Sequence, residues 1–430
     1  MNSENKGKFV RPEVLSPAGN YEKMTAAIRF GADAVYLAGS EFGMRTACDN
    51  FTTDELSSAA DYVHSAGRKL YLTVNTLPHG DEYPRLREFL LATRDMRIDA
   101  YIAADLGVIS LIKELLPDAA VHISTQASIC SPQAAKVYAS MGASRLVLAR
   151  ELTLDEIRAI RDAIPDGVGL EAFAHGSMCV SYSGRCMLSN MLTGRDANKG
   201  ACAQPCRWNY TLIEEKRPDE RIPIEETPLG TFIMSSKDMC MIEHVGKLAD
   251  AGVSSLKIEG RVKSAYYTAV VTNAYKSACL ALEKFVNEGG NPADFTSDPA
   301  LMNELLSVSH REYCTGFFFD RPADNPQLVT SPGYVRDKAY LAIAEETGTL
   351  PEGLTGTDKN GRLYRFRQRN KFFAGDDAEL LTPGKTGRVI HITELYGEDG
   401  QPIDSTPHPD MVFYARVPSE ILPGDIVRAH

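Results

Sequence analysis

The sequence lacks several features that define broad classes of protein. No run of about eighteen or more apolar residues occurs, so no segment could cross a membrane as a helix. The N-terminal stretch MNSENKGKFVRPE has no apolar core of the kind found in secretory signals, and we therefore expect a cytoplasmic protein. The zinc-protease pattern H-E-x-x-H and a recognisable protease triad are also missing, which argues against a known class of peptidase.

Positive charge is in short supply. The chain has 46 Lys and Arg residues against 57 Asp and Glu residues, which gives a net charge of −11. An excess of this sign repels nucleic acid over the surface as a whole, so an RNA partner requires a local basic patch. The hydrophobic content of 43% and the charged content of 24% are ordinary for a globular protein, and 430 residues are enough for two domains.

Residues 8–285 alternate between short apolar runs and helical patterns, and three of the helical segments end at Gly31, Gly67 and Gly142, which suits a left-handed helix cap. Eight strand–helix units over about 250 residues are typical of a (β/α)8 TIM-like barrel. A doubly wound open sheet is the competing fold, but no G-x-G-x-x-G follows the first strand. The eight predicted strands lie in the runs RPEVLSPAG, DAVYLAGS, KLYLTVNT, DAYIAADLG, AVHISTQAS, SRLVLAR, GVGLEAFAHG and SSLKIEGR.

The C-terminal third has a different pattern. We interpret residues 286–332 as a helical linker region. From residue 333 to 430 the chain consists of short strand runs separated by Gly and Pro turns, which predicts a small all-β, barrel-like domain. The predicted fold class is therefore α/β, a (β/α)8 barrel followed by a small β domain.

One segment of this second domain, RLYRFRQRNKFFAGD, is rich in cations. On a strand, alternate side chains share a face, so the cations would form a basic stripe and Tyr364, Phe366 and Phe372 would face the core. In an acidic protein we interpret the stripe as an RNA-backbone contact, and a charged strand edge that prevents aggregation is the alternative. The stripe consists of Arg365, Arg367, Arg369 and Lys371.

Polar residues follow the predicted barrel strands, where barrel enzymes place their active sites. Any one of them alone is better explained as a helix cap or a rim residue, but together they predict a polar pocket. They are Ser16, Tyr36, Asn75, Asp105, His122, Gln126, Arg150, Glu171, His175, Glu259 and Arg261.

The densest group of reactive side chains is a cysteine-rich insertion, residues 176–240, that begins where the seventh strand ends. Its cysteines follow the spacing C-x6-C-x15-C-x3-C and then a longer gap. They are Cys179, Cys186, Cys202, Cys206 and Cys240.

In a reducing compartment such a group indicates a metal or catalytic site rather than disulfides. Four thiolates can bind zinc or an iron–sulfur cluster, and the wide spacing suits a cluster better than paired zinc knuckles. A cysteine protease would need an activated thiolate beside a histidine, and His175 precedes Cys179 by four residues. We interpret the remaining cysteines as ordinary free thiols, and these are Cys48, Cys130, Cys279 and Cys314.

The pattern E-x-F-x-x-G-S-M-C-x6-C-x-x-S, from Glu171 to Ser189, resembles the signature of the collagenase-like peptidase family of unknown catalytic type, peptidase U-32. The segments VLSPAGNYEKMTAAIRFGADAVYLAG, HISTQAS, GACAQPCRWNY and MSSKDMC resemble the same family, and the second domain resembles that of its longer members. Within the family, the chain is most similar to the proteins for prephenate-dependent 5-hydroxylation of the tRNA wobble uridine.

This resemblance implies an oxygen-independent tRNA-modifying enzyme with a 4Fe–4S cluster, prephenate as co-substrate and tRNA as partner. A paralogous subunit or a homo-oligomer is a further implied possibility, and no membrane partner is expected. A collagenase-like peptidase, and an rRNA or small-molecule hydroxylation protein of the same family, remain the alternatives. One relative's ligand pattern falls on Cys179, Cys186, Cys202 and Cys240, whereas a second relative's close pair favours Cys206 as the alternate fourth ligand.

The resemblance and the positions of the residues together suggest roles. Prephenate is a diacid and calls for arginine clamps, for which Arg150, Arg185 and Arg261 are candidates. Glu171 and His175 are the acid–base candidates, and Gln126 completes the candidate catalytic group with Arg150. Trp208 is either a stacking surface for a flipped base or a core anchor. The other candidates for base stacking or phosphate contacts are Tyr210, Arg207, Arg195 and Lys199.

Overall fold

The structure is a computed structural model of the chain. It describes residues 9–44, 49–179, 181–182, 185–208, 226–227, 230–231, 236–319, 335, 337–358 and 361–430. None of the helices in these ranges is long and apolar enough to span a membrane.

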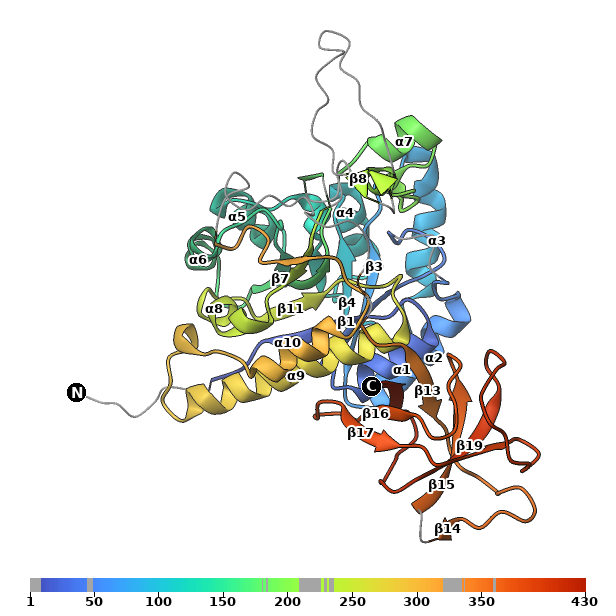
Figure 1. The fold of residues 1–430 in the computed structure, drawn as a ribbon. Coiled ribbons are helices and arrows are strands. Elements are labelled where there is room, and N and C mark those ends of the chain that lie inside the picture. The colour runs from blue at the N-terminus through green and yellow to red at the C-terminus, as the bar shows by residue number, and fades with distance from the viewer. Residues whose placement is uncertain are drawn as a thin grey trace, which may run out of the picture.

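Eight parallel strands close into a barrel, as predicted (Figure 1). Each strand pairs with the next along the chain, and the last barrel strand pairs with both β7 and β1, which removes every open edge of the barrel. The barrel strands are β1 (Glu13–Pro17), β2 (Ala34–Ala38), β3 (Lys69–Val74), β4 (Ala100–Ala103), β5 (Val121–Ile123), β6 (Arg145–Val147), β7 (Gly169–Ser177) and β11 (Ser255–Ile258).

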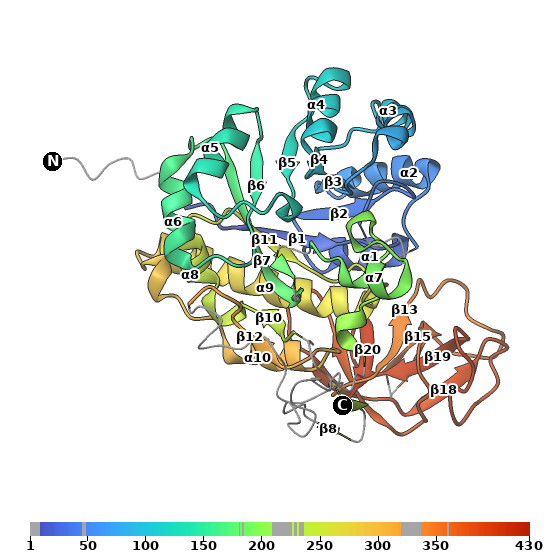
Figure 2. The same cartoon turned by 90° about the horizontal axis from the view of Figure 1, so that it is seen from above.

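Helices alternate with these strands and cover the outside of the barrel (Figure 2). Their ends follow local signals: Thr52 and Thr153 form capping boxes, and Gly31, Gly67 and Gly142 have φ values of +100°, +66° and +83° after helix ends, as predicted. The helices are α1 (Tyr21–Arg29), α2 (Thr53–Ser65), α3 (Tyr83–Ala92), α4 (Leu106–Leu115), α5 (Pro132–Ser140), α6 (Leu154–Ala163), α8 (Val245–Asp250) and α9 (Ala265–Asn287).

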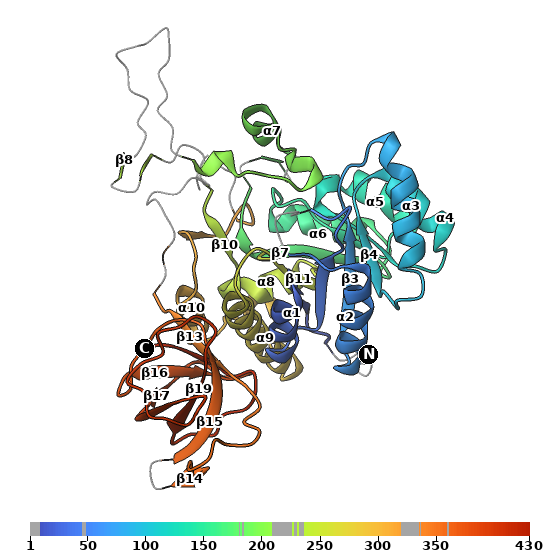
Figure 3. The ribbon, with the colours of Figure 1, turned by 90° about the vertical axis from the view of Figure 1, so that its right-hand side faces the viewer.

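Strand β7 is longer than its neighbours and leaves the barrel at its carboxyl end. There it pairs with the antiparallel strand β10 (Asp238–Cys240), which in turn pairs with β12 (Tyr313–Cys314). Between β7 and β10, the described part of the cysteine-rich insertion contains α7 (Leu188–Thr193), which lies above the barrel in Figures 1 and 3. This extension carries the chain from the barrel interior to the cysteines.

The region predicted as a linker, 286–332, is described up to residue 319. It contains helix α10 (Pro299–Leu306), and Phe295, Leu305 and Phe318 are buried in the same apolar core as the barrel helices. Short 3-10 turns complete the barrel domain. They are Gly80–Glu82, Thr125–Ala127, Ala197–Lys199, Pro205–Arg207, Ile242–His244 and Pro292–Asp294.

The C-terminal domain is an antiparallel sheet, which confirms the predicted all-β domain. Its strands run in the order β17-β16-β20-β13-β15-β19-β18, with β14 paired to β15. Outside this domain, β8 (Glu226–Thr227) and β9 (Gly230–Thr231) of the cysteine-rich insertion form a separate two-stranded sheet. The strands are β13 (Tyr340–Ala344), β14 (Thr357–Asp358), β15 (Gly361–Gln368), β16 (Asp377–Leu381), β17 (Arg388–His391), β18 (Glu394–Gly397), β19 (Val412–Val417) and β20 (Ile426–Ala429).

The two domains are joined by a buried polar contact. The Arg428 guanidinium of β20 donates to Glu304 of α10 at 2.8 and 2.9 Å and to Glu379 of β16 at 2.8 Å. Asn273 of α9 accepts a hydrogen bond from the backbone N–H of Gly384 at 2.7 Å. The sheet therefore lies against the side of the barrel formed by α1 and α9 (Figure 3).

Candidate functional site

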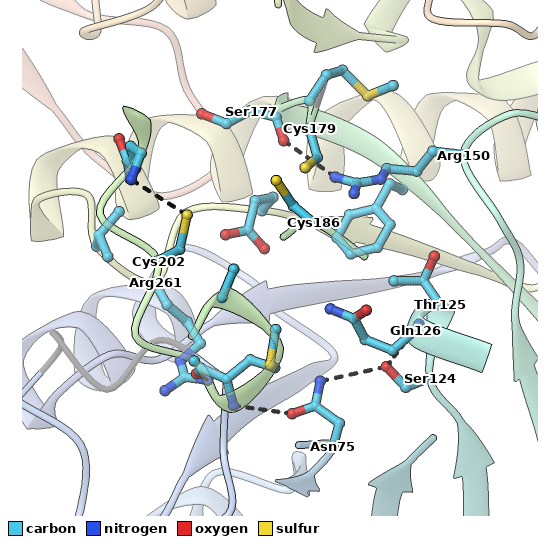
Figure 4. A pocket seen from close by; sticks show the side chains of 18 of the residues that line it. Asn75, Ser124, Thr125, Gln126, Arg150, Ser177, Cys179, Cys186, Cys202 and Arg261 are labelled. Carbon is cyan, nitrogen blue, oxygen red and sulfur yellow. Dashed lines mark hydrogen bonds between the residues drawn. The ribbon is translucent and has the colours of Figure 1, made fainter. Parts of the chain in front are cut away.

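A pocket opens at the carboxyl ends of the barrel strands (Figure 4). Its volume is about 160 Å³, close to the roughly 150 Å³ of a protein cavity that accepts benzene, so a six-membered ring fits. Strands β3, β5, β6, β7 and β11 each deliver polar side chains to its wall. These include Asn75, Ser124, Gln126, Arg150, Ser177, Glu259 and Arg261.

Four half-buried thiols line this pocket, namely Cys179, Cys186, Cys202 and Cys206. Figure 4 shows the Cys179 and Cys186 side chains pointing toward one another, with Arg150 beside Cys179. Burial, together with the neighbouring thiols, raises the pKa of Cys206. The fold of the insertion thus brings together cysteines that are up to 27 positions apart in the sequence.

Local hydrogen bonds connect the part of the insertion that follows Cys186 with the part that follows Cys202. The Ser189 hydroxyl donates to the carbonyl of Arg195 at 2.7 Å and accepts from the N–H of Ala203 at 3.0 Å. Backbone N–H groups also donate to two of the sulfurs, from Leu188 to Cys186 Sγ at 3.3 Å and from Gln204 to Cys202 Sγ at 3.4 Å. Such donors stabilise thiolate charge, which favours metal binding.

The fifth cysteine of the insertion, Cys240, lies elsewhere. It is buried on β10 next to Tyr275, burial raises the pKa of its thiol to about 12, and it does not line the pocket. The preferred sequence-based ligand set, with Cys240 as fourth member, is therefore not brought together here. The structure brings Cys206 to the other three thiols instead.

The donor chemistry fits a soft metal centre. Four thiols at one pocket suit zinc or an iron–sulfur cluster and do not suit Mg²⁺ or Ca²⁺. As the side chains are placed in the described ranges, no group of three or more His, Cys, Asp or Glu residues is arranged to hold a metal ion. The case for a soft metal at this site therefore rests on the chemical identity of the four thiols and on their location in one pocket.

Arg150 is the pocket arginine best placed to bind an anion. Its guanidinium lies 5.4 Å from the centre of the Phe173 ring and donates to the carbonyl of Ser177 at 3.5 Å. Within the described part of the chain, no carboxylate pairs with Arg150. Its charge is therefore available to a ligand in the pocket.

The other predicted arginine clamps have structural partners. Arg261 lines the pocket but is 3% exposed, and its guanidinium donates to the carbonyl of Met44 at 2.8 Å and to Asn50 Oδ1 at 2.5 Å. Arg185 is exposed and donates to the carbonyl of Gln126 at 2.8 Å. Arg261 thus binds both Met44 and Asn50, and Arg185 connects the cysteine-rich insertion to the loop after β5.

Glu171 does not have the acid–base role that the sequence suggested. It is fully buried inside the barrel, where it accepts from Lys257 Nζ at 2.9 Å and from Arg145 at 3.1 Å. Burial alone would raise the pKa of Glu171, but the two cations prevail and lower it to about 2. A carboxylate that stays ionised and does not line the pocket cannot shuttle protons there near neutral pH.

Sequence reasoning missed Lys257, which Glu171 positions. Its ammonium group lies 4.4 Å from the centre of the Tyr36 ring, and both side chains line the pocket floor. A lysine in the middle of an otherwise buried strand was the available signal, because buried cations need a partner or a ligand.

His175 is also absent from the pocket. The residue is 1% exposed, and its ring packs against three tyrosine rings. The distances between ring centroids are 5.9 Å to Tyr267, 5.6 Å to Tyr275 and 5.3 Å to Tyr313. Burial lowers the pKa of His175 to about 3, so the ring stays neutral. A cysteine–histidine pair of the protease type is therefore not formed by His175 and Cys179.

The residues of the insertion that we considered as RNA contacts differ in exposure and in their partners. Trp208 is 42% exposed, which excludes a core anchor, and Arg207 lines the pocket and donates to Gln204 Oε1 at 3.0 Å. Lys199 pairs with Glu82 at 2.8 Å, and Arg195 donates to the carbonyl of Ala201 at 3.1 Å. Tyr210 lies outside the described residues.

The predicted basic stripe on β15 is matched by carboxylates. Tyr364, Phe366 and Phe372 are buried, as predicted, but the strand ends at Gln368. Two of the stripe's arginines, Arg365 and Arg367, pair with Glu345. Arg369 pairs with Glu22 and Asp410, and Lys371 lies 4.8 Å from the ring centre of Phe373. The cations therefore do not form one free face.

Comparison with known proteins gives consistent matches over both domains. A model described as peptidase family U32 matches residues 19–327, and one described as peptidase family U32 C-terminal domain matches residues 353–428. The solved structure of the U32 peptidase Mk0906 aligns over 60% of this chain and 96% of its own, with 15% identity and a TM-score of 0.38.

Three curated relatives have different names. A tRNA hydroxylation protein P1 from Bacillus subtilis is 33% identical over 97% of this chain and 94% of its own. A collagenase from Porphyromonas gingivalis is 34% identical over 76% of this chain and 78% of its own. A 23S rRNA 5-hydroxycytidine C2501 synthase from Escherichia coli is 38% identical over 67% of this chain and 42% of its own.

Proposed function

The chain belongs to peptidase family U32, and from this premise we propose that it is an enzyme that hydroxylates tRNA. The observation that carries the proposal is one ring-sized pocket lined jointly by four thiols, the guanidinium of Arg150 and the amides of Asn75 and Gln126. Support from similarity comes from the relative named as a tRNA hydroxylation protein, which matches both domains.

The finer proposal is an oxygen-independent 5-hydroxylation of the wobble uridine with prephenate as co-substrate. A flipped pyrimidine ring would enter the pocket, and Asn75 and Gln126 would hydrogen-bond its edge. Arg150 would bind a carboxylate of the co-substrate, and the Lys257 ammonium at the pocket floor adds positive charge for a second anionic group. Glu171 keeps Lys257 in position from inside the barrel.

We propose that Cys179, Cys186 and Cys202 hold a 4Fe–4S cluster, with Cys206 as the fourth ligand that the pocket favours. When bound, such a cluster supplies electron transfer or a binding position for an oxygen-bearing group. The backbone donors to the sulfurs of Cys186 and Cys202 would stabilise the thiolate charge.

The geometry supports the peptidase alternative less well than it supports tRNA hydroxylation. A thiol peptidase needs a histidine in contact with its nucleophile, and His175 is packed among tyrosines and does not line the pocket that holds the four thiols. An rRNA nucleoside would enter the same pocket, so measurement of both RNA classes distinguishes the two substrates.

The test expresses the chain in a strain that lacks its own tRNA hydroxylation genes. Mass spectrometry then measures hydroxylated uridine in tRNA and hydroxylated cytidine in rRNA. We expect hydroxyuridine from the wild type, its loss in Cys179→Ser and Cys202→Ser, and its retention in Cys279→Ala, which alters a buried thiol of α9 outside the pocket. Full modification in Cys179→Ser would overturn the role of the thiols, and hydroxylated rRNA alone would redirect the substrate.

A second experiment identifies the fourth ligand. Iron and sulfide are measured in anaerobically purified Cys206→Ser and Cys240→Ser variants, against about four irons per chain expected for the wild type. We expect Cys206→Ser to lose iron and Cys240→Ser to keep it, because Cys206 lines the pocket and Cys240 does not. The reverse result would support the set with Cys240, and a colourless zinc protein would contradict the cluster.

A further inference from the structure

A second, larger cavity of about 650 Å³ lies between the barrel and the β domain. Its wall consists of the loop after β11, the start of α9, the start of β13 and the residues after β15. It shares Ser177, Gln204, Arg207, Glu259 and Val262 with the first pocket, here named the thiol pocket. The two cavities are therefore adjacent, and we infer that the larger one, here named the junction groove, binds the RNA backbone next to the target nucleoside.

The charge of the junction groove is opposite to that of the whole chain. Among the described residues that line it, four are cationic and only Glu259 is acidic, although the chain carries a net charge of −11. A local excess of cations in an acidic protein marks the place where a polyanion is attracted rather than repelled. The four cations are Arg207, Lys263, Lys338 and Arg369.

The carboxylates that pair with Lys338 and Arg369 stand outside the groove wall. Lys338 pairs with Glu379, and Arg369 pairs with Glu22 and Asp410, none of which lines the groove. Lys263 Nζ donates to the carbonyl of Ser309 at 3.1 Å, which fixes the ammonium group at the wall. The cations are thus oriented before a ligand arrives.

Packed tyrosines form part of the groove wall. The rings of Tyr266 from α9 and Tyr340 from β13 stack with centroids 5.5 Å apart, and Tyr267 also lines the wall. Tyr266 and Tyr267 are only 5% and 2% exposed, so they shape the wall and leave little ring surface for a base. The groove would therefore contact the RNA backbone through its cations.

The groove is preformed, since the domains that make its walls are firmly joined. The buried Arg428 connects α10 with β16 and β20, and Tyr266 and Tyr340 contact across the same junction. A rigid groove binds without the cost of ordering its walls. This placement also divides the predicted basic stripe, because Arg369 lines the groove whereas Arg365 and Arg367 do not.

The inference rests on the proposed function for the identity of the RNA. A nucleotide strand that passes from the groove to the thiol pocket would place one base over the thiols and the phosphates of its neighbours on the cations. The substrate class is accordingly a nucleoside in a single-stranded loop, flanked by unpaired nucleotides.

The test measures the affinity of bulk tRNA for the full-length protein by fluorescence anisotropy over a series of salt concentrations. For Arg369→Gln we expect about fivefold weaker binding at about 0.1 M salt and a salt slope smaller by roughly 0.7, the values for one lost phosphate contact on single-stranded RNA. Lys263→Glu should weaken the binding of tRNA by at least the same factor. Turnover at saturating tRNA should persist, so that KM rises more than kcat falls.

Matched controls keep the test specific. Arg362→Gln changes an exposed arginine at the other end of β15, and Lys284→Glu reverses an exposed lysine at the other end of α9, and both should bind as the wild type does. Thermal unfolding checks that each variant is folded. Because Arg369 also pairs with Glu22 across the junction, Lys263→Glu decides the outcome if Arg369→Gln is unstable.

The outcomes separate the two proposals. If the wild type modifies tRNA but Lys263→Glu and Arg369→Gln bind like the controls, the groove is wrong and the function stands. If the two variants weaken RNA binding while no hydroxylated nucleoside is formed, the groove stands and the function fails.

Discussion

Individual side chains acquire their roles from burial and partners. Arg145 and Arg150 are five positions apart, yet Arg145 is held by Glu13 and Glu171 inside the barrel, whereas Arg150 reaches the pocket over Phe173. The same contrast separates Glu171, which is buried and ionised, from Glu259, which lines both cavities. A residue type in a motif therefore limits its possible chemistry, and its neighbours select the chemistry.

Replacement of Glu171 tests its role as an ionised support. Glu171→Gln would leave Lys257 buried without a carboxylate, whereas Arg145 would still pair with Glu13 at 2.6 Å. We expect the free energy of unfolding to fall by about 3–5 kcal/mol, measured by urea denaturation. The double variant Glu171→Gln/Lys257→Met should recover part of this loss, because it removes the unpaired cation as well.

A different result would restore Glu171 as an acid–base residue. If Glu171→Gln were as stable as the wild type and shifted the pH dependence of tRNA modification, the acid–base interpretation would be correct.

The decisive element is the extension of β7. Its first half is a barrel strand that pairs with β6 and β11, and its second half leaves the barrel and pairs with β10. Gly176 makes this change of direction possible: its φ is +111°, and a Cβ at this position would lie 2.4 Å from the carbonyl oxygen of Glu259. The residues directly after it, Ser177 and Cys179, enter the pocket.

Substitution of Gly176 should therefore disturb the element as a whole. We expect Gly176→Ala to lower the free energy of unfolding by more than about 2 kcal/mol, from the positive φ and the collision together, and to reduce tRNA modification. Gly194→Ala is the matched control in the same insertion, because Gly194 has a φ of +72° but no atom within 4 Å of the added Cβ. It should cost only about 1 kcal/mol. Equal stability of the two variants would contradict the importance of the close contact.

At the scale of the whole molecule, buried ionisable groups hold the barrel and the domain junction together, and they make stability depend on pH. Burial lowers the pKa of His122 to about 3, so below about 6.5 the unfolded chain binds a proton that the folded protein excludes. For Glu171 and Glu379 burial opposes ionisation, but their cationic partners prevail and lower both pKa values to about 2. Their contribution is complete above about pH 4.5 and is lost as the pH falls toward 2.

We therefore expect stability to fall continuously from about pH 6.5 downward, first through buried histidines and then through carboxylates. Chemical denaturation at a series of pH values measures this. His122→Gln should reduce the slope between pH 6 and 4.5 by up to about 1.4 kcal/mol per pH unit, while the slope below pH 4.5 remains. A wild-type stability that rose between pH 6 and 4.5 would contradict the assignment.

Local sequence determined the elements and their order. Apolar runs alternating with helical patterns predicted the eight barrel strands, and glycines after helices predicted the left-handed caps, because these features depend on neighbours a few residues away. The density of cysteines after the seventh strand likewise located the site at one end of the barrel. The family was evident from the motif that begins at Glu171.

Tertiary structure alone decided which of these residues meet. Barrel closure buried Glu171 and placed Lys257, which is only 5% exposed, in the pocket wall, and the folding of the insertion brought Cys206 rather than Cys240 to the other thiols. Docking of the β domain brought Arg369 to the same cavity as Lys263, 106 positions away in the sequence, and so formed the junction groove. The physical reason is that contacts across a closed barrel and a domain junction join distant residues, and no local periodicity encodes those distances.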